Sequence, residues 1–211
     1  TEQLKGLIQW DNEAPRRDGI MVQLPLPKHL DERQIIDAID PSKDVDGLTT
    51  INIGKLRSGQ PCFQPCTARG VIDLLDYYGI ELDGKDVTII GRSNIVGKPL
   101  ADLMMARGAT VTQCHSHTKV LRFHTRSADI VVSAVGQPKL IDYQNANFGG
   151  VVIDVGINRD ENGKLCGDVD FEAVSKHCDI TPVPGGVGPM TVAELLRNTV
   201  EAWQRNVEED V

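Results

Sequence analysis

The sequence lacks a long hydrophobic run, an excess of positive charge and internal repeats. None of its apolar segments approaches the roughly 20 residues of a membrane span. Its N-terminus has neither the basic nor the apolar region of a secretory signal. The 22 Lys and Arg residues against 30 Asp and Glu give a net charge of −8. This charge argues against general binding to nucleic acid or to an anionic membrane, so an anionic ligand needs a local site.

The cysteines also lack the pattern of a disulfide framework or a metal site. There are five, an odd number, and they are scattered along the chain, which favours a reducing compartment. Cys62 and Cys66 form a C-x3-C pair, and His177 adjoins Cys178. A zinc site needs better-matched ligand pairs, so free thiols are favoured and no metal is expected. We expect a cytoplasmic protein, with the alternative that an organelle signal was removed from a longer precursor.

The first 66 residues predict only part of an α/β domain. A strand is expected over residues 19–24, and Asp31 with Gln34 is expected to cap a helix over residues 32–39. An earlier helix is indicated by three apolar residues at helical spacing: Leu4, Leu7 and Ile8. One strand and two helices are too few for an independent sheet. The start of the chain therefore reads as the end of a domain.

From Thr67 onward the sequence predicts alternating helices and strands. Thr67 is expected to cap a helix that runs to about Tyr78, and a second helix is expected over residues 96–107. The first of these helices has four apolar residues on one face: Val71, Leu74, Leu75 and Tyr78. Four strands are expected over residues 86–90, 109–113, 129–134 and 150–155.

The four strands are rich in Val, Ile and Thr and show little alternation, which is typical of a sheet covered on both faces. The fold class is therefore α/β, with a Rossmann-like, doubly wound parallel sheet. A long amphipathic helix over residues 190–205 is expected to close the chain. Its apolar face comprises Val192, Leu195, Leu196, Val200 and Trp203.

The first strand runs directly into Gly91 and the motif GRSNIVG, and a helix follows. The spacing is G-x-S-x-x-x-G, with Ser93 in place of the middle glycine of the dinucleotide fingerprint. Gly91 permits a tight turn, and Gly97 lets the helix pack closely and aim its N–H groups at a pyrophosphate. A glycine match alone is weak, but its position between a strand and a helix favours dinucleotide binding over a structural turn.

The end of the second strand favours NADP over NAD. An NAD site usually has an acidic residue there, which binds the ribose 2′-hydroxyl. This chain has Cys114-His115-Ser116-His117 and no acid. Arg92 can make a bidentate pair with a 2′-phosphate, and Ser116 can add a hydroxyl. The alternative is that Arg92 is a solvated surface residue.

Three further motifs stand out. VQLPLP (22–27) places Gln23 among apolar neighbours, where a buried amide must pair with backbone or a ligand. KDVDG (43–47), taken alone, favours a solvated acidic turn. TPVPGGVGPMT (181–191) forms a loop poor in side chains, which lets a flat ring approach the main chain closely.

Together these motifs closely resemble the bifunctional methylenetetrahydrofolate dehydrogenase/cyclohydrolase family. The resemblance covers essentially the whole chain and includes PCTARG (65–70), ATVTQCHSHT (109–118), VVIDVGIN (151–158) and GDVDF (167–171). It implies a Rossmann domain that faces a smaller α/β domain across a folate cleft. It also implies NADP-dependent oxidation of 5,10-methylenetetrahydrofolate, then hydrolysis to 10-formyltetrahydrofolate, by an enzyme that is typically a homodimer.

The resemblance also implies roles for individual residues. Gln23 and Asp46 would line the pterin pocket and serve catalysis, and Asp46 would bind the amino-pyrimidine ring. Substrate would also meet the loop of Pro184, Gly185, Gly186 and Val187. The implied NADP-binding residues are Thr67, Gly91, Arg92, Ser93, Ile95, Ser116, Ala134, Gly136 and Ile157.

Two departures from the family pattern are visible. Ala68 stands where the family usually has proline, and no Tyr-x-x-x-Lys pair occurs in the chain. The pair belongs to the early part of the family pattern, so we expect this chain to lack that part. The family uses the lysine of the pair for hydrolysis, so we also expect poor hydrolysis by this chain. The rival hypothesis is a catalytically silent NADP-binding protein or fragment.

The resemblance divides the chain into four expected parts. They are a partial folate domain over residues 1–66, a connecting helix over 67–79, an NADP-binding Rossmann domain over 80–189, and a helix over 190–211 that returns to the folate domain.

Overall fold

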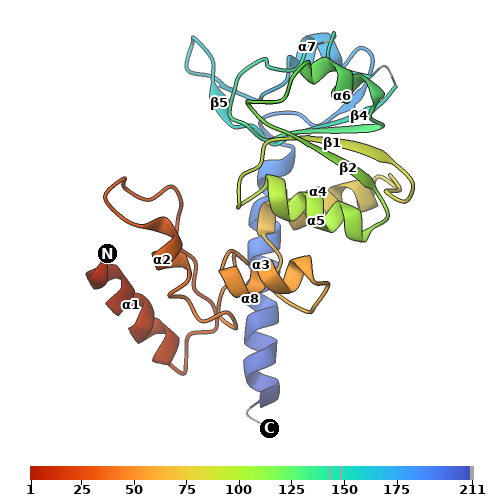
Figure 1. Ribbon diagram of the computed structural model, residues 1–211. Coiled ribbons are helices and arrows are strands. Elements are labelled where there is room, and N and C mark those ends of the chain that lie inside the picture. Colours follow the sequence, from red (N-terminus) through yellow and green to blue (C-terminus); the bar gives the residue numbers. More distant parts are fainter. Residues whose placement is uncertain (143, 148, 210–211) are drawn as a thin grey trace. The chain divides into compact units, whose positions relative to one another are not determined.

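The computed structural model describes residues 1–142, 144–147 and 149–209 (Figure 1). The chain divides into two compact units. Unit 1 comprises Thr1–Cys66 and Val192–Val211, and unit 2 comprises Thr67–Thr191. The last two residues of the expected segment 190–211 lie outside the described part of the chain.

Unit 2 is built on a five-stranded parallel sheet, which confirms the predicted fold class. The order is β2-β1-β3-β4-β7. The strands are β1 (Asp86–Ile90), β2 (Thr110–Cys114), β3 (Ile130–Ser133), β4 (Val151–Asp154) and β7 (Asp179–Ile180). The ends of the four predicted strands thus lie within one residue of their expected positions. The fifth, β7, was not predicted, since two residues are too few for a periodic pattern.

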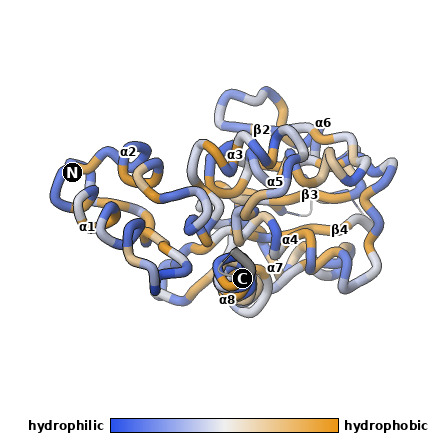
Figure 2. Tube along the Cα trace, turned by 90° about the horizontal axis from the view of Figure 1, so that it is seen from below, coloured by the Kyte–Doolittle hydropathy of each residue, from blue (hydrophilic) through white to orange (hydrophobic). Residues whose placement is uncertain are grey.

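Helices cover both faces of this sheet. Figure 1 shows α4 (Cys66–Tyr77) and α5 (Gly97–Ala106) on one side, with α6 (Leu121–Ser127) and α7 (Phe171–Val174) on the other. The central strands are almost wholly buried, and Figure 2 shows β3 and β4 as hydrophobic stretches. The prediction of little alternation is wrong for β2, whose residues alternate in exposure because it lies at the sheet edge. A short hairpin of β5 (Asn158–Arg159) and β6 (Leu165–Cys166) completes the unit.

Two details of α4 differ from prediction. The helix begins at Cys66, so Thr67 lies in its first turn, and the Thr67 hydroxyl pairs with that of Thr191 at 3.1 Å. Val71 and Leu75 are fully buried as predicted, but Tyr78 is 70% exposed. Tyr78 lies beyond the last helical residue, which takes its side chain off the buried face.

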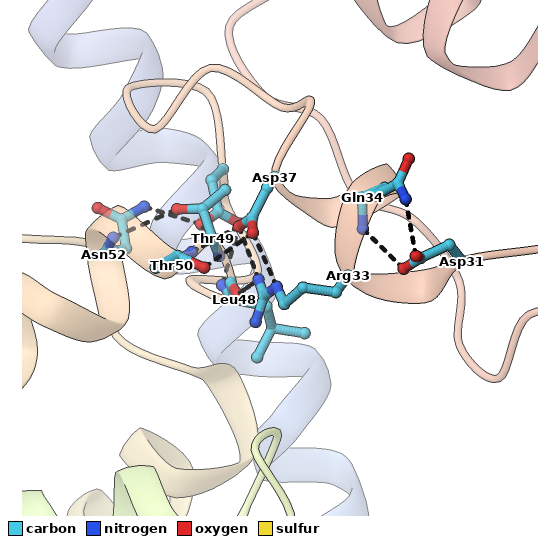
Figure 3. A network of polar contacts seen from close by, with 9 residues as sticks. Asp31, Arg33, Gln34, Asp37, Leu48, Thr49, Thr50 and Asn52 are labelled. Carbon is cyan, nitrogen blue, oxygen red and sulfur yellow. Dashed lines mark hydrogen bonds and ion pairs between the residues drawn. The ribbon is translucent and has the colours of Figure 1, made fainter. Parts of the chain in front are cut away.

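Unit 1 contains α1 (Glu2–Glu13), α2 (Glu32–Ile36), α3 (Thr50–Arg57) and most of α8 (Val187–Glu209). Asp31 caps α2 as predicted, since its carboxylate accepts from the Gln34 backbone at 3.1 Å and side chain at 2.8 Å (Figure 3). The helix α2 ends three residues earlier than expected. The helix α3 was not predicted, because its sequence TINIGKLR has no clear apolar face.

The strand predicted over residues 19–24 is wrong. Within residues 19–24, all of which the structure describes, only Ile20 forms a bridge, to Asp44, and its N–H donates to the Lys43 carbonyl at 2.7 Å. A strand needs a partner along its length, and this segment pairs at one point alone. The apolar composition of residues 19–24 is therefore not enough to predict a strand.

The core of unit 1 also differs from the predicted amphipathic faces. Ile8, Ile20, Ile35 and Ile39 form one buried cluster, whereas Leu7 is 62% exposed. In α8, four residues of the expected apolar face are more than half exposed: Val192, Leu196, Val200 and Trp203. Between residues 192 and 207 of this helix the buried positions are instead Glu194, Asn198 and Ala202. They follow at intervals of four residues and thus share one face of the helix.

Asn198 explains why a polar face is buried. Its side-chain amide donates to the backbone carbonyls of Val45 at 2.8 Å and Gln64 at 3.1 Å. A buried amide with such partners stabilises a specific packing that an apolar side chain could not provide. Among the described residues, no helix combines the length and apolar character needed to cross a membrane.

Candidate functional site

Two glycines shape the turn between β1 and α5. Gly91 has a φ of +121°, and a Cβ there would lie 2.5 Å from the Ala134 carbonyl oxygen. A Cβ on Gly97 would overlap the Gly91 carbonyl group and lie 3.0 Å from the Arg92 nitrogen. The turn and the start of α5 therefore pack backbone against backbone, which only glycine allows.

Ser93 caps the first turn of α5. Its hydroxyl accepts from the N–H groups of Val96 at 3.2 Å and Gly97 at 3.3 Å. Its carbonyl accepts from Lys98 at 3.0 Å, and Pro99 has no N–H group. The expectation that these N–H groups aim at a pyrophosphate is thus not met, since the loop itself occupies them. The reason is the serine at the middle position of the fingerprint.

Arg92 and Ser116 lie at the same edge of the sheet. Each follows its strand by two residues, and β1 and β2 are neighbours whose register pairs Ile90 with Cys114. The Gly91 N–H donates to the Cys114 carbonyl at 2.9 Å, and this bond extends the pairing beyond the strands. Arg92 and Ser116 are both exposed. The edge therefore offers a guanidinium and a hydroxyl, without an acidic side chain between residues 114 and 118.

A compact turn presents Ser116. The His115 N–H donates to the Thr118 hydroxyl at 2.9 Å, and the His117 N–H donates to the His115 Nδ1 at 3.1 Å. Thr118 in turn donates its N–H to the His115 carbonyl at 2.8 Å. These bonds hold the backbone of the turn and leave the Ser116 side chain exposed.

The remaining NADP-binding candidates of unit 2 lie in loops at the carboxyl ends of strands. Ala134 and Gly136 follow β3, and Ile157 follows β4 and is 70% exposed. Ile95, in the turn after β1, is 40% exposed. In open parallel sheets ligands bind at the carboxyl ends of the strands, so the structure brings these candidates to the expected edge.

The loop TPVPGGVGPMT shows which of its residues can face a ligand. Pro184 and Gly185 are exposed, and Gly185 has a φ of +100°. Gly186 lies so close to the Pro182 carbonyl that a Cβ would stand 2.5 Å from its oxygen. Val187 is 4% exposed and begins α8. Its side chain packs inside the protein and is not accessible to a ligand.

Sequence reasoning missed a cavity beside this loop. It has a volume of about 580 Å³ and is mainly apolar. Residues of α4, β4, β7 and the loop line it, among them Leu74, Tyr78, Ile153, Gly186 and Met190.

In unit 1, Gln23 does not have the predicted surroundings. Its side chain is exposed and donates to the neighbouring Leu24 carbonyl at 3.1 Å. The prediction of a buried amide is wrong, because the segment around Gln23 forms no strand and its apolar neighbours do not enclose it.

The KDVDG loop is not the solvated turn that its composition alone favours. Asp44 is 1% exposed and accepts from Leu48 N–H at 3.2 Å, Thr49 N–H at 2.8 Å and the Asn52 side chain at 2.8 Å. These bonds tie the loop to the start of α3, the region shown in Figure 3. Asp44 therefore has a structural role that sequence reasoning did not assign.

Asp46 has a different environment from Asp44. Burial raises the pKa of its carboxyl group, contact with the Cys66 thiol opposes this rise, and repulsion from Asp44 adds to it. The pKa of Cys66 is raised to about 12, first by burial and then by the negative charge of Asp46. Cys66 is thus a neutral thiol at physiological pH. Asp46 is therefore a half-buried carboxylate whose ionised form is disfavoured by burial. Such groups are frequent at functional sites.

Lys43 has no free ammonium group for chemistry. Its Nζ donates to three carbonyls at the end of α1, those of Asp11 at 3.3 Å, Asn12 at 2.6 Å and Ala14 at 3.1 Å. Within the described ranges, no three His, Cys, Asp or Glu side chains are grouped as metal ligands. The five cysteines are free thiols.

Family models match both parts of the chain. Residues 65–207 match the NAD(P)-binding domain of tetrahydrofolate dehydrogenase/cyclohydrolase, and residues 1–46 match its catalytic domain. The Bifunctional protein FolD of Agathobacter rectalis is 54% identical over 205 residues, which are 97% of this chain and 74% of that protein. The FolD protein of Bacillus subtilis is 51% identical over 97% of this chain and 73% of its own length.

Solved structures of proteins from the same family also resemble this chain. The bifunctional FolD methylenetetrahydrofolate dehydrogenase/cyclohydrolase of Campylobacter jejuni has a TM-score of 0.95 at 50% identity, covering 97% of this chain and 73% of that one. The Trypanosoma brucei FolD structure, complexed with NADP and an inhibitor, has a TM-score of 0.92 at 43% identity, covering 98% and 73%. With its two family-model matches and these relatives, the chain belongs to the tetrahydrofolate dehydrogenase/cyclohydrolase family.

Proposed function

We propose that this chain oxidises 5,10-methylenetetrahydrofolate to the methenyl form with NADP, and that hydrolysis to 10-formyltetrahydrofolate follows. Family membership supports the reaction. The observation that carries the choice of cofactor is the edge formed by Arg92 and Ser116 after two neighbouring strands, with no acid between residues 114 and 118. We assign NADP binding to unit 2 and folate binding to unit 1.

The residues at the β1–β2 edge fit a 2′-phosphate. A guanidinium can make two parallel charge-assisted hydrogen bonds to phosphate oxygens, and a serine hydroxyl can add a third. An acidic residue, which would select the 2′-hydroxyl of NAD and repel a phosphate, does not occur in the turn 114–118. The Trypanosoma brucei relative, whose structure holds NADP, is consistent with this choice.

The exposed loops after β3 and β4 fit the nicotinamide end. Ala134, Gly136 and Ile157 would lie along the ring, and the loop that contains Gly185 and Gly186 would flank the active site on unit 2. When bound, NADP supplies a hydride acceptor at its nicotinamide ring. The substrate carbon gives up a hydride with its electron pair, and the adjacent folate nitrogen stabilises the resulting cation. This chain's residues contribute mainly by positioning the reacting atoms.

Asp46 would bind the amino-pyrimidine ring of the folate. Such a ring presents N–H donors, and a carboxylate is an acceptor that can take two of them. Burial raises the pKa of Asp46 because it removes water from the ionised carboxylate. N–H donors from a ligand would replace that water and stabilise the ionised form. Gln23, exposed in the structure, has an amide available for a ligand. For the hydrolytic step, a Tyr-x-x-x-Lys pair is absent from these 211 residues, and we expect slow hydrolysis.

Two variants, one in each proposed binding region, test the proposal. Arg92→Ala should weaken NADP binding by about 10-fold to 150-fold, since a hydrogen bond to a charged group contributes roughly 1.5–3 kcal/mol. Its affinity for NAD should be unchanged. Asp46→Asn should raise the folate KM or abolish turnover while NADP affinity stays constant. Arg126→Ala, another exposed arginine of unit 2, is the matched control.

Calorimetric titration with both cofactors, and turnover followed by the absorbance of the methenyl product, give the readouts. Equal affinity of the parent chain for NAD and NADP would contradict the cofactor assignment. NADP binding without any turnover would support the rival hypothesis of a silent NADP-binding protein.

We also propose that the protein is a cytoplasmic homodimer. Dimerisation rests on the family resemblance, and the free thiols fit a reducing compartment. Size-exclusion chromatography with light scattering measures the mass in solution against the 23.1 kDa of one chain.

A further inference from the structure

Asp168 lies in unit 2 outside the residues assigned above, and its side chain accepts five hydrogen bonds. It is fully buried. Its carboxylate accepts from the Ser133 hydroxyl at 3.0 Å, the N–H groups of Val135 at 2.8 Å, Gly136 at 3.3 Å and Gln137 at 2.8 Å, and the Asn158 side chain at 2.9 Å. These five donors are neutral. A buried carboxylate is tolerated only when donors satisfy it in this way.

A second buried carboxylate holds Asp168 itself. Asp154, at the end of β4, accepts from the N–H groups of Gly156 at 3.0 Å, Asp168 at 2.9 Å and Val169 at 2.9 Å. A Cβ on Gly156 would overlap the Asp168 carboxylate, and one on Gly167 would overlap that of Asp154. The two glycines therefore make room for two carboxylates packed against main chain.

The bonds of Asp168 join two loops. Three consecutive N–H groups, from residues 135 to 137, converge on one carboxylate, so the loop after β3 is folded around it. Asn158, the neighbour of Ile157, donates to the same carboxylate from the segment after β4. Because both loops share one acceptor, neither can move without breaking a bond to Asp168.

We propose that Asp168 is the positioning residue of the nicotinamide end of the site. It would fix Ala134 and Gly136 relative to Ile157, and Asp154 would fix Asp168. The inference rests on the proposed function, which places these loops along the nicotinamide. Arg92 and Ser116 follow β1 and β2, and the bonds that hold their turns do not involve Asp168. The Ala134 N–H donates to the Ile90 carbonyl at 2.9 Å, so the two ends share the strand pairing. The carboxylate of Asp168, however, holds only the loops at the nicotinamide end.

This restriction of Asp168 to one end leads to a measurable difference between two ligands. Adenosine 2′,5′-bisphosphate has the adenosine and the 2′-phosphate of NADP but no nicotinamide. In Asp168→Asn an amide replaces one carboxylate oxygen with an N–H donor that faces other donors. We expect NADP affinity to fall by about 10-fold or more. The affinity for adenosine 2′,5′-bisphosphate should stay within about twofold, as for distant and independent sites.

The experiment titrates both ligands into the 211-residue chain and its variants. Asp170→Asn is the matched control, because Asp170 caps α7 and asparagine caps helices equally well. In turnover, kcat should fall for Asp168→Asn while the folate KM holds. If Asp168→Asn does not fold, Asn158→Ala tests the inference in its place, because it removes one donor to Asp168 and keeps the carboxylate. It should weaken NADP binding and spare the bisphosphate.

Three results would overturn the inference. The first is unchanged NADP affinity in whichever of the two variants folds, and the second is an equal loss of affinity for both ligands in a variant with native circular dichroism. The third is a parent chain that binds neither ligand, which would refute the proposed function itself and the positioning role with it.

Discussion

Replacing Gly97 by alanine tests whether backbone packing at the β1–α5 turn builds the cofactor site. The new Cβ would lie 2.7 Å from the Gly91 carbonyl carbon, where ordinary contact begins at 3.4 Å. The atoms in contact belong to backbone, so the start of α5 and the turn must separate by at least about 0.7 Å. Overpacking of this kind destabilises by about 1–3 kcal/mol.

A matched substitution gives the opposite expectation. Gly54 lies inside α3, and a Cβ there would meet nothing within 4 Å. Gly54→Ala should stabilise the chain by roughly 0.5–1 kcal/mol, because alanine favours a helix interior. At Gly97 this gain is smaller than the cost of the clash, so the net effect has the other sign.

The assay separates the two units. Both tryptophans, Trp10 and Trp203, belong to unit 1, so urea unfolding is followed by tryptophan fluorescence and by far-UV circular dichroism together. Gly97→Ala should shift only the part of the transition that fluorescence does not report. The displaced turn carries Arg92, so NADP affinity should fall by about 10-fold or more. Unchanged stability of unit 2 and unchanged NADP affinity in this variant would refute the packing argument.

Two other predictions concern unit 1. Lys43→Met should destabilise this unit by about 1.5–3 kcal/mol, because it removes the charged donor from three carbonyls at the end of α1. Lys28→Met, at an exposed lysine, is the control, and equal unfolding midpoints for the two would contradict this role. Because the pKa of Asp46 is raised in the folded state, its contribution to stability is lost as pH rises from the ordinary aspartate range through the raised value. Asp46→Asn should therefore melt above the parent at pH 7, with a difference that shrinks toward pH 4; a constant difference would contradict the burial argument.

Local patterns predicted unit 2 well. The strands β1 to β4, the helix α5 and the turn at Gly91 all depend on short-range features, namely branched apolar runs, glycine and helix stop signals. Strand register then carries Arg92 and Ser116 to one edge, since β1 and β2 are neighbours. That edge could be predicted because parallel strands joined by one helix have a regular geometry.

Unit 1 could be predicted less well, because its stability depends on partners distant in sequence. The Gln23 segment is apolar but pairs at Ile20 alone, and α8 buries Asn198 on carbonyls more than 130 residues away along the chain. Apolar periodicity cannot reveal either fact, since both depend on which backbone groups meet after folding.

The sequence by itself determined the class of the fold, the glycine turn after β1 and the absence of an acid beside Ser116. Each of these is written within about thirty consecutive residues of one strand–helix–strand unit. Only the tertiary structure decided three features: the hydroxyl of Ser93 caps α5, the ammonium group of Lys43 binds carbonyls at the end of α1, and the carboxylate of Asp168 joins two loops. The physical reason is that a hydrogen-bond donor acquires its role from the acceptor that folding brings to it, and no local pattern names that acceptor.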